Sequence, residues 1–280
     1  MAPLVFVVGC GPGGSGGSGD PRTEPRADKY GSGVRLHEVL GARATLENGE
    51  PGFSWLDPDD MESASCTGIP RDQELMVTGL TLTAVDDFDE TGAGAIGNYY
   101  AQDSAPPPVP HSGITIFNPG FSPPDLRVVA GDVLDAFGVL TEFGGPSSSP
   151  FRFCRTLPEM SGSLEFRFEG GEVEPATPPV ADFARYATAR PWIGMLVTLE
   201  NVKTLESPNL SGAGRYSIRF DAGEQPAGEE LPTLTNELMD LPAVIPEDTP
   251  AGTVIRRVTG VVTYFYQVHV SPRSAADIEL

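Results

Sequence analysis

The chain has 280 residues, 39% hydrophobic and 20% charged, a balance that fits a folded globular body of one or two domains. Its 39 acidic and 18 basic residues give a formal net charge of -21, which repels polyanions and disfavours nucleic acid as a partner. The 33 glycines and 28 prolines favour many turns and few long helices.

The first ten residues predict attachment to a membrane through lipid. Leu4–Cys10 reads LVFVVGC, an apolar run that ends in a small residue and a cysteine, and it resembles the lipobox of bacterial lipoprotein signals. We expect a signal over 1–10 and a diacylglycerol on the Cys10 thiol. Met1–Pro3 lacks the basic residues of an ordinary signal, so a disordered cytosolic N-terminus with a chance cysteine is the alternative. No apolar stretch is long enough to span a bilayer, so any anchor must be lipid.

The residues that follow predict a tether and an irregular entry to the body. Gly and Ser dominate 11–27, a composition typical of a flexible linker. Residues 28–72 mix short apolar clusters with turn residues, and we expect one short helix near Leu36–Leu40. With Cys10 lipidated, Cys66 and Cys154 form an even pair, which predicts a disulfide in an oxidising compartment. Two buried free thiols are the alternative, because spacing alone does not bring the two together.

From Glu74 onward, alternating apolar and polar residues predict β-strands separated by turns. A Pro-rich stretch with one short helix at 181–188 interrupts this pattern and predicts a domain boundary. The domains are therefore expected at 73–175 and 192–280, joined by a linker over 176–191. The predicted strands cover 77–85, 98–102, 113–117, 132–143, 162–168, 194–204, 214–220, 253–265 and 266–271.

The two predicted domains share short sequences. Gly138–Phe143 and Gly260–Phe265 both read Gly-Val-aliphatic-Thr-X-Phe, and Val77–Gly79 recurs as Val258–Gly260. A repeat at domain spacing indicates one supersecondary unit used twice. Coincidence is the alternative, since Val, Thr and Gly are common in strands and turns.

Five segments in order carry a family resemblance: 77–79 (VTG), 99–103 (YYAQD), 112–117 (SGITIF), 129–132 (VAGD) and 138–143 (GVLTEF). This order resembles the OB-fold modules found beside extracellular bacterial nuclease domains, and the whole chain is similar to secreted lipoproteins of myxobacterial type. The resemblance implies an all-β protein with two OB-like small β-barrels in tandem, a disordered N-terminal leash and short helices only. The second barrel is the more divergent copy. Within the barrel, Gly131 would make a tight turn and Gly138 would let a curved strand bend.

Catalytic signatures are absent from the sequence. His37, His111 and His269 are the three histidines, a number that limits catalytic triads, and neither His111 nor His269 has a serine or cysteine partner in sequence context. We therefore predict no enzyme and no cofactor, with a divergent extracellular hydrolase as the alternative. Asp87, Asp89 and Thr91 overlap the start of a calcium loop, but a solvated acidic hairpin loop explains them better than weak calcium binding.

Ligand binding is predicted on the strand faces and loops that OB-folds use for oligosaccharides and oligonucleotides. We expect a non-catalytic envelope protein, anchored to the outer membrane or cell surface, that binds or scaffolds a protein or glycan partner. The main alternative is a nucleic-acid-binding accessory module of a secreted nuclease system. The candidate ligand-binding residues are Tyr99, Tyr100, Phe143, Tyr264, Phe265, Tyr266, Arg256 and Arg257.

Overall fold

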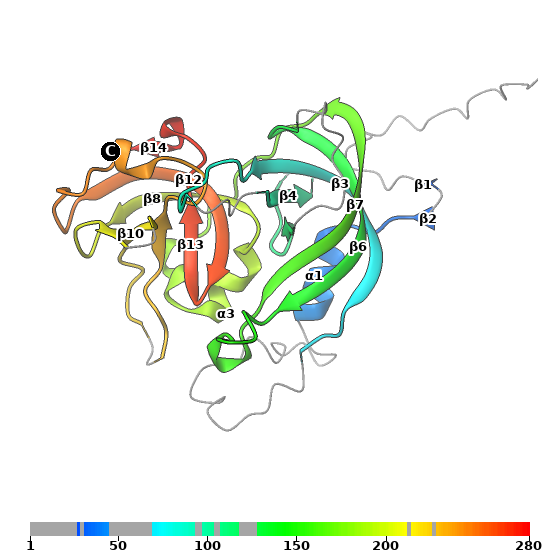
Figure 1. Ribbon diagram of the computed structural model, residues 1–280, viewed down its shortest axis with the longest axis horizontal. Coiled ribbons are helices and arrows are strands. Elements are labelled where there is room, and N and C mark those ends of the chain that lie inside the picture. The colour runs from blue at the N-terminus through cyan, green and yellow to red at the C-terminus, as the bar shows by residue number, and fades with distance from the viewer. Residues whose placement is uncertain are drawn as a thin grey trace, which may run out of the picture.

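The structure is a computed structural model that describes residues 27–28, 31–44, 69–92, 97–103, 107–117, 128–211, 214–225 and 228–280. The predicted signal, Cys10, Cys66 and most of the predicted linker at 11–27 lie outside these residues. Within them the chain is built mainly of strands, arranged as two modules side by side (Figure 1). None of the helices in the described ranges is both long and apolar enough to cross a membrane.

The first module is a closed barrel of five strands in the order β3-β4-β5-β7-β6. All neighbours are antiparallel except β5 and β7, which run parallel. With the strands numbered one to five along the chain, this order is 1-2-3-5-4, the connectivity of an OB-fold barrel. The strands are β3 (Gln73–Val85), β4 (Tyr99–Asp103), β5 (Gly113–Ile116), β6 (Asp132–Phe143) and β7 (Leu157–Gly170).

The second module repeats this connectivity. β8 pairs with β12, β12 with β13, β13 in parallel with β11, and β11 with β10. A single antiparallel bridge between Thr204 and Phe220 joins the end of β8 to the end of β10 and closes the ring. The predicted all-β class is therefore confirmed, with one closed five-stranded barrel and a second, seven-stranded sheet of the same connectivity. The strands are β8 (Leu196–Lys203), β10 (Tyr216–Arg219), β11 (Thr233–Thr235), β12 (Val254–Phe265) and β13 (Gln267–Ser271), with β9 (Asn209–Leu210) and β14 (Ile278–Glu279) at the edges.

The sequence repeat corresponds in part to this structural repeat. Gly138–Phe143 lies in β6 and Gly260–Phe265 lies in β12, the fourth strand of each module. A Cβ at Gly138 would lie 1.9 Å from the Ser161 carbonyl oxygen on β7, so only glycine allows the two strands to approach this closely. The shorter repeat, Val77–Gly79 and Val258–Gly260, lies in β3 and β12, which are not equivalent strands of the two modules.

Helix α1 (Leu36–Ala44) covers the first barrel, longer than the predicted helix by one turn. Leu36 and Leu40 are fully buried in the core of that barrel. The Asp103 carboxylate accepts hydrogen bonds from the backbone N–H groups of Leu36 and His37, which satisfies donors that the first turn of a helix leaves unpaired. Helix α1 is thus a structural part of the first barrel. Two short strands, β1 (Ala27–Asp28) and β2 (Gly31–Ser32), precede the helix.

The Pro-rich segment between the modules is packed and not a free linker. Phe183, Tyr186 and Ala189 are buried in the core of the second module, and Ala176 bridges to β8. Buried Arg190 donates to both carboxylate oxygens of Glu142 on β6, at 3.1 and 3.0 Å, so this segment also holds the first module. The segment forms η3 (Val180–Ala184), α3 (Tyr186–Ala189) and η4 (Arg190–Trp192); the other short helices are η2 (Arg152–Cys154), η5 (Leu241–Ala243) and η6 (Ala275–Asp277).

The two modules meet at very short range. A Cβ added to Gly113 on β5 would lie 2.2 Å from the backbone carbon of Gly194. Around this contact, the His111 N–H donates to the Pro191 carbonyl at 2.7 Å and the Leu196 N–H donates to the Gln102 side chain at 3.0 Å. Glycine on both sides lets the backbones touch, and these two hydrogen bonds then fix the orientation of one barrel against the other.

Candidate functional site

A cavity of about 810 Å³ lies between the two modules, within the size range of small-molecule sites. Its walls come from equivalent places in both barrels. The second and third strands contribute Tyr100 and Thr115 from the first module, and Ser217 and Thr235 from the second. The residues after the third strands, Phe117 in the first module and Asn236 and Glu237 in the second, also line it. Further walls come from the loops after the first and fourth strands, the regions that OB-folds use for ligands. These loops contribute Asp86, Glu90, Asn98, Ser211, Arg215 and Tyr266, next to Phe143, Leu157 and Phe265 at the adjoining strand ends.

Strand alternation decides which tyrosine reaches this cavity. Tyr99 packs in the core of the first barrel, while Tyr100 points to the outer face and lines the cavity. On the second module, Val262 and Tyr264 lie in the core, and Thr263 and Phe265 alternate with them. Tyr264 sits near the module boundary and lines the cavity as well.

A group of aromatic side chains forms one wall. The Phe151 ring lies edge-on to the rings of Phe143, Tyr264, Phe265 and Tyr266, with centroids 5.1 to 5.6 Å apart. These edge-to-face contacts join the loop after β6 to the tight turn between β12 and β13. The wall is therefore a packed structure built by both modules.

Tyr266 stands in the turn between β12 and β13 with a φ of 65°. This left-handed conformation is unfavourable for a residue with a Cβ, and such residues are concentrated at functional sites. Its hydroxyl donates to the Ser149 carbonyl at 2.7 Å, which draws the turn toward the first module.

Glu237 ties the polar side of the cavity together. The buried Tyr100 hydroxyl donates to Glu237 Oε1 at 2.5 Å, across the module boundary. The Thr263 and Ser271 hydroxyls donate to Oε2 at 3.2 and 3.1 Å. Burial, with Glu237 beside it, holds the pKa of Tyr100 well above its ordinary value, so the hydroxyl stays protonated and remains a donor.

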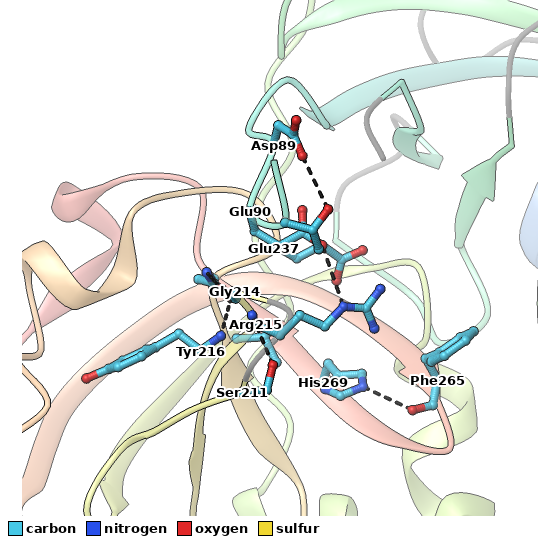
Figure 2. Close-up of polar contacts among 12 residues, drawn as sticks. Asp89, Glu90, Ser211, Gly214, Arg215, Tyr216, Glu237, Phe265 and His269 are labelled. Atoms are coloured by element: carbon cyan, nitrogen blue, oxygen red, sulfur yellow. Dashed lines mark hydrogen bonds and ion pairs between the residues drawn. The ribbon is translucent and has the colours of Figure 1, made fainter. Parts of the chain in front are cut away.

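Two further carboxyl groups of the first module face the same region. Burial raises the pKa of Asp86 to about 7, and the negative charges of Glu237 and Glu90 act in the same direction. Burial also raises the pKa of Glu90. Figure 2 shows Glu90 and Glu237 close together, with the Arg215 guanidinium beside them. Arg215 Nε lies 3.8 Å from Glu90 Oε1, and the Arg215 guanidinium also stands 5.7 Å from the Phe265 ring centroid.

His269 and Glu159 complete the titratable groups of the cavity wall. One His269 ring nitrogen pairs with the Thr233 hydroxyl at 2.8 Å, and the other lies 3.2 Å from the Phe265 carbonyl (Figure 2). Burial lowers the pKa of His269, so the ring is neutral, and burial raises the pKa of Glu159 to about 7. Neither residue has a serine or cysteine partner in these contacts.

Tyr100, Phe143, Tyr264, Phe265 and Tyr266, five of the predicted ligand-binding residues, line this cavity. Tyr99 lies in the barrel core instead. Arg256 and Arg257 are exposed and pair with Glu279 on β14, away from the cavity walls.

The predicted metal-binding residues Asp87, Asp89 and Thr91 are not among the residues that line the cavity. Asp87 and Asp89 are exposed, and the Thr91 hydroxyl donates to Asp89 at 3.4 Å. Within the described residues, no group of three or more His, Cys, Asp or Glu side chains is arranged to hold a metal ion. The predicted disulfide involves Cys66, which lies outside the described residues, so that pairing stays a prediction.

Asp86, Glu90, Arg215 and Glu237 were not among the residues selected from sequence. Asp86 and Glu90 belong to the acidic stretch that the sequence favours as a solvated hairpin loop; their position directly after the first barrel strand is the signal that could have identified them. Glu237 is an isolated acidic residue after a three-residue strand, with no motif to mark it.

Comparison with known proteins adds no family. No protein-family model matches the chain, and no curated protein matches it significantly. The site must therefore be interpreted from its own geometry.

Proposed function

We propose that this chain is a lipid-anchored, non-catalytic protein of the bacterial cell envelope that binds a glycan in the cavity between its two OB-like modules. The observation that carries the proposal is the composition of the cavity: aromatic rings on one wall, and carboxyl, hydroxyl and amide groups on the other. Sugars present apolar ring faces and several hydroxyl donors, and pockets of this mixed kind match them. The residues stand where OB-folds hold oligosaccharides.

The charge of the cavity argues against the nucleic-acid alternative. Glu90, Glu159, Asp86 and Glu237 face it, against Arg215 as the cationic side chain in the wall. A groove that follows phosphates needs several Lys or Arg side chains, because counterion release drives that binding. A neutral or cationic ligand suits this cavity better.

Glycan binding is tested by applying the full chain to a glycan array, with Tyr266→Asn as the cavity variant. Asparagine tolerates the left-handed backbone that Tyr266 adopts, so the change removes a ring from the wall without adding backbone strain. We expect the wild type to bind a restricted set of glycans and Tyr266→Asn to lose at least about tenfold in affinity. Val254→Ala, an exposed apolar change outside the cavity, is the control.

Two outcomes overturn parts of the proposal. If the chain binds no glycan on the array, the proposal of glycan recognition is refuted. Because paired carboxyl groups also carry out glycoside hydrolysis, bound glycans are recovered and checked for cleavage, and cleavage would remove the non-catalytic assignment.

The lipid anchor rests on the sequence that ends at Cys10 and on the Gly/Ser-rich stretch after it. In a bacterial host that is fed labelled palmitate, we expect label on the wild type and recovery in the membrane fraction. Cys10→Ser should carry no label and should leave the membrane fraction. Equal labelling of both proteins would refute the anchor.

A further inference from the structure

Three carboxyl groups from both modules converge at one end of the cavity. Asp86 and Glu90 come from the loop between β3 and β4 of the first module, and Glu237 follows β11 of the second. Glu237 and Glu90 both act on Asp86 electrostatically and raise its pKa. Like charges brought together in a buried place are costly unless a cation balances them.

The protein supplies little of that balance. The Arg215 side chain is 56% exposed and its Nε lies 3.8 Å from Glu90, beyond hydrogen-bond distance. His269 is neutral, because burial lowers its pKa. The described walls of the cavity therefore carry more negative than positive charge.

Acceptor atoms at this end also lack donors. Asp86 Oδ1 and Glu90 Oε2 are buried without a hydrogen-bond partner among the residues that the structure describes. The Thr115 hydroxyl, on the neighbouring strand face, is likewise buried and unpartnered. Asp86 is 4% exposed and Thr115 3% exposed, so bulk water does not reach these groups freely. Buried polar groups of this kind normally have partners, and here a ligand can provide them.

The aromatic wall adds a second attraction for positive charge. Tyr100, Tyr264 and Phe265 line the same cavity as the carboxyl groups. The faces of aromatic rings attract cations, and this attraction grows when water is excluded.

Building on the proposed glycan binding, we propose that the cavity selects a glycan carrying a free, protonated amino group, an amino sugar, and places the ammonium among Asp86, Glu90 and Glu237. An ammonium brings three donors and one positive charge, and it faces three carboxyl groups, two of which, Asp86 and Glu90, have an unpartnered acceptor oxygen. The rest of the sugar lies against the rings. A hydroxyl or acetamido group at the same position brings donors without the charge.

The test uses three β-1,4-linked tetramers that differ only at the second carbon of each ring: the glucosamine tetramer, the N-acetylglucosamine tetramer and cellotetraose. Affinities for the full chain are measured by isothermal titration calorimetry. We expect the glucosamine tetramer to bind at least about tenfold more tightly than the other two, the factor expected for one charge-assisted interaction. Added salt should reduce this preference.

Two variants with the same charge change locate the effect. Glu90→Gln should remove most of the preference for the amine, while Asp87→Asn, in the same loop but exposed and outside the cavity wall, should retain it. Melting temperatures confirm that both variants fold, and Asp86→Asn gives a second cavity variant.

Each outcome decides the matter. Equal affinity for the three tetramers would leave glycan binding in place and refute amine selection. A preference for the amine that survives in Glu90→Gln and Asp86→Asn would refute this location. Binding of none of the tetramers would count against glycan binding and amine selection together.

Discussion

The hydrogen bond from Tyr100 to Glu237 joins the two modules in the wall of the cavity, and its removal should lower the stability of the whole chain. Tyr100→Phe keeps the ring and deletes the hydroxyl that donates to Glu237 Oε1 at 2.5 Å. Tyr100 is 1% exposed, so water cannot replace the lost donor easily. A buried hydrogen bond to a charged acceptor is worth about 1.5 to 3 kcal/mol.

For a chain of this size, that loss corresponds to a fall in Tm of roughly 3 to 10 °C. The assay is chemical and thermal unfolding followed by circular dichroism. Tyr266→Phe is the matched control, because it deletes a hydroxyl whose acceptor is the neutral Ser149 carbonyl at the surface. It should cost no more than about 1 kcal/mol.

A double-mutant cycle with Glu237→Gln isolates the interaction between the two side chains. Glu237→Gln leaves only a neutral acceptor for the Tyr100 hydroxyl. The combined variant should be more stable than the sum of the single changes predicts, because each single change already removes the same charge-assisted bond. A loss under about 0.5 kcal/mol in Tyr100→Phe, or simple additivity in the cycle, would refute the role of this bond.

Three other changes test further features of the structure. Arg190→Met should cost about 1.5 to 3 kcal/mol in denaturant unfolding, because it removes a charge-assisted donor from the buried Glu142 carboxylate, which keeps Arg43 at 3.7 Å and the Thr156 hydroxyl; a cost under about 0.5 kcal/mol would contradict this. Because the folded pKa of Asp86, about 7, lies above its ordinary value of 3.8, the folded state keeps a proton that the unfolded chain loses. Stability should therefore fall as pH rises between these values, and Asp86→Asn should flatten that part of a plot of Tm against pH. Gly113→Ala should destabilise the chain by about 1 to 3 kcal/mol and weaken ligand binding, since its Cβ would strike the Gly194 backbone; unchanged Tm and affinity would show that the modules are free to separate.

Regular alternation made most strands predictable from the sequence. β6 has the predicted bounds, Asp132–Phe143, because this segment is rich in Val, Leu and Phe and lies between two glycines, Gly131 and Gly144. β11 (Thr233–Thr235) was missed, because three residues are too few to show a period. β7 begins at Leu157, five residues before the predicted start at residue 162, and its second residue is Pro158, a residue type that is uncommon inside strands.

The site was only partly predictable, because its two halves come together through the docking of two modules. Aromatic residues near strand ends were identifiable, and Tyr100, Phe143 and Tyr266 do line the cavity. Which of two adjacent tyrosines points outward depends on register, which a pair such as Tyr99 and Tyr100 cannot reveal alone. Glu237 meets Asp86 only because one barrel is fixed against the other, and no local pattern encodes that contact.

The packed segment between the modules limits how far the two barrels can move when a ligand binds. Tyr186 packs this segment into the core of the second module, and Arg190 binds Glu142 of the first barrel. The Gly113 and Gly194 backbones are already in contact, so the two barrels cannot move closer together there. The two barrels are thus a preorganised receptor, whose ordering cost is met during folding and not at each encounter. A ligand would lose little affinity to domain closure, and solution scattering of the free and bound protein should give the same radius of gyration.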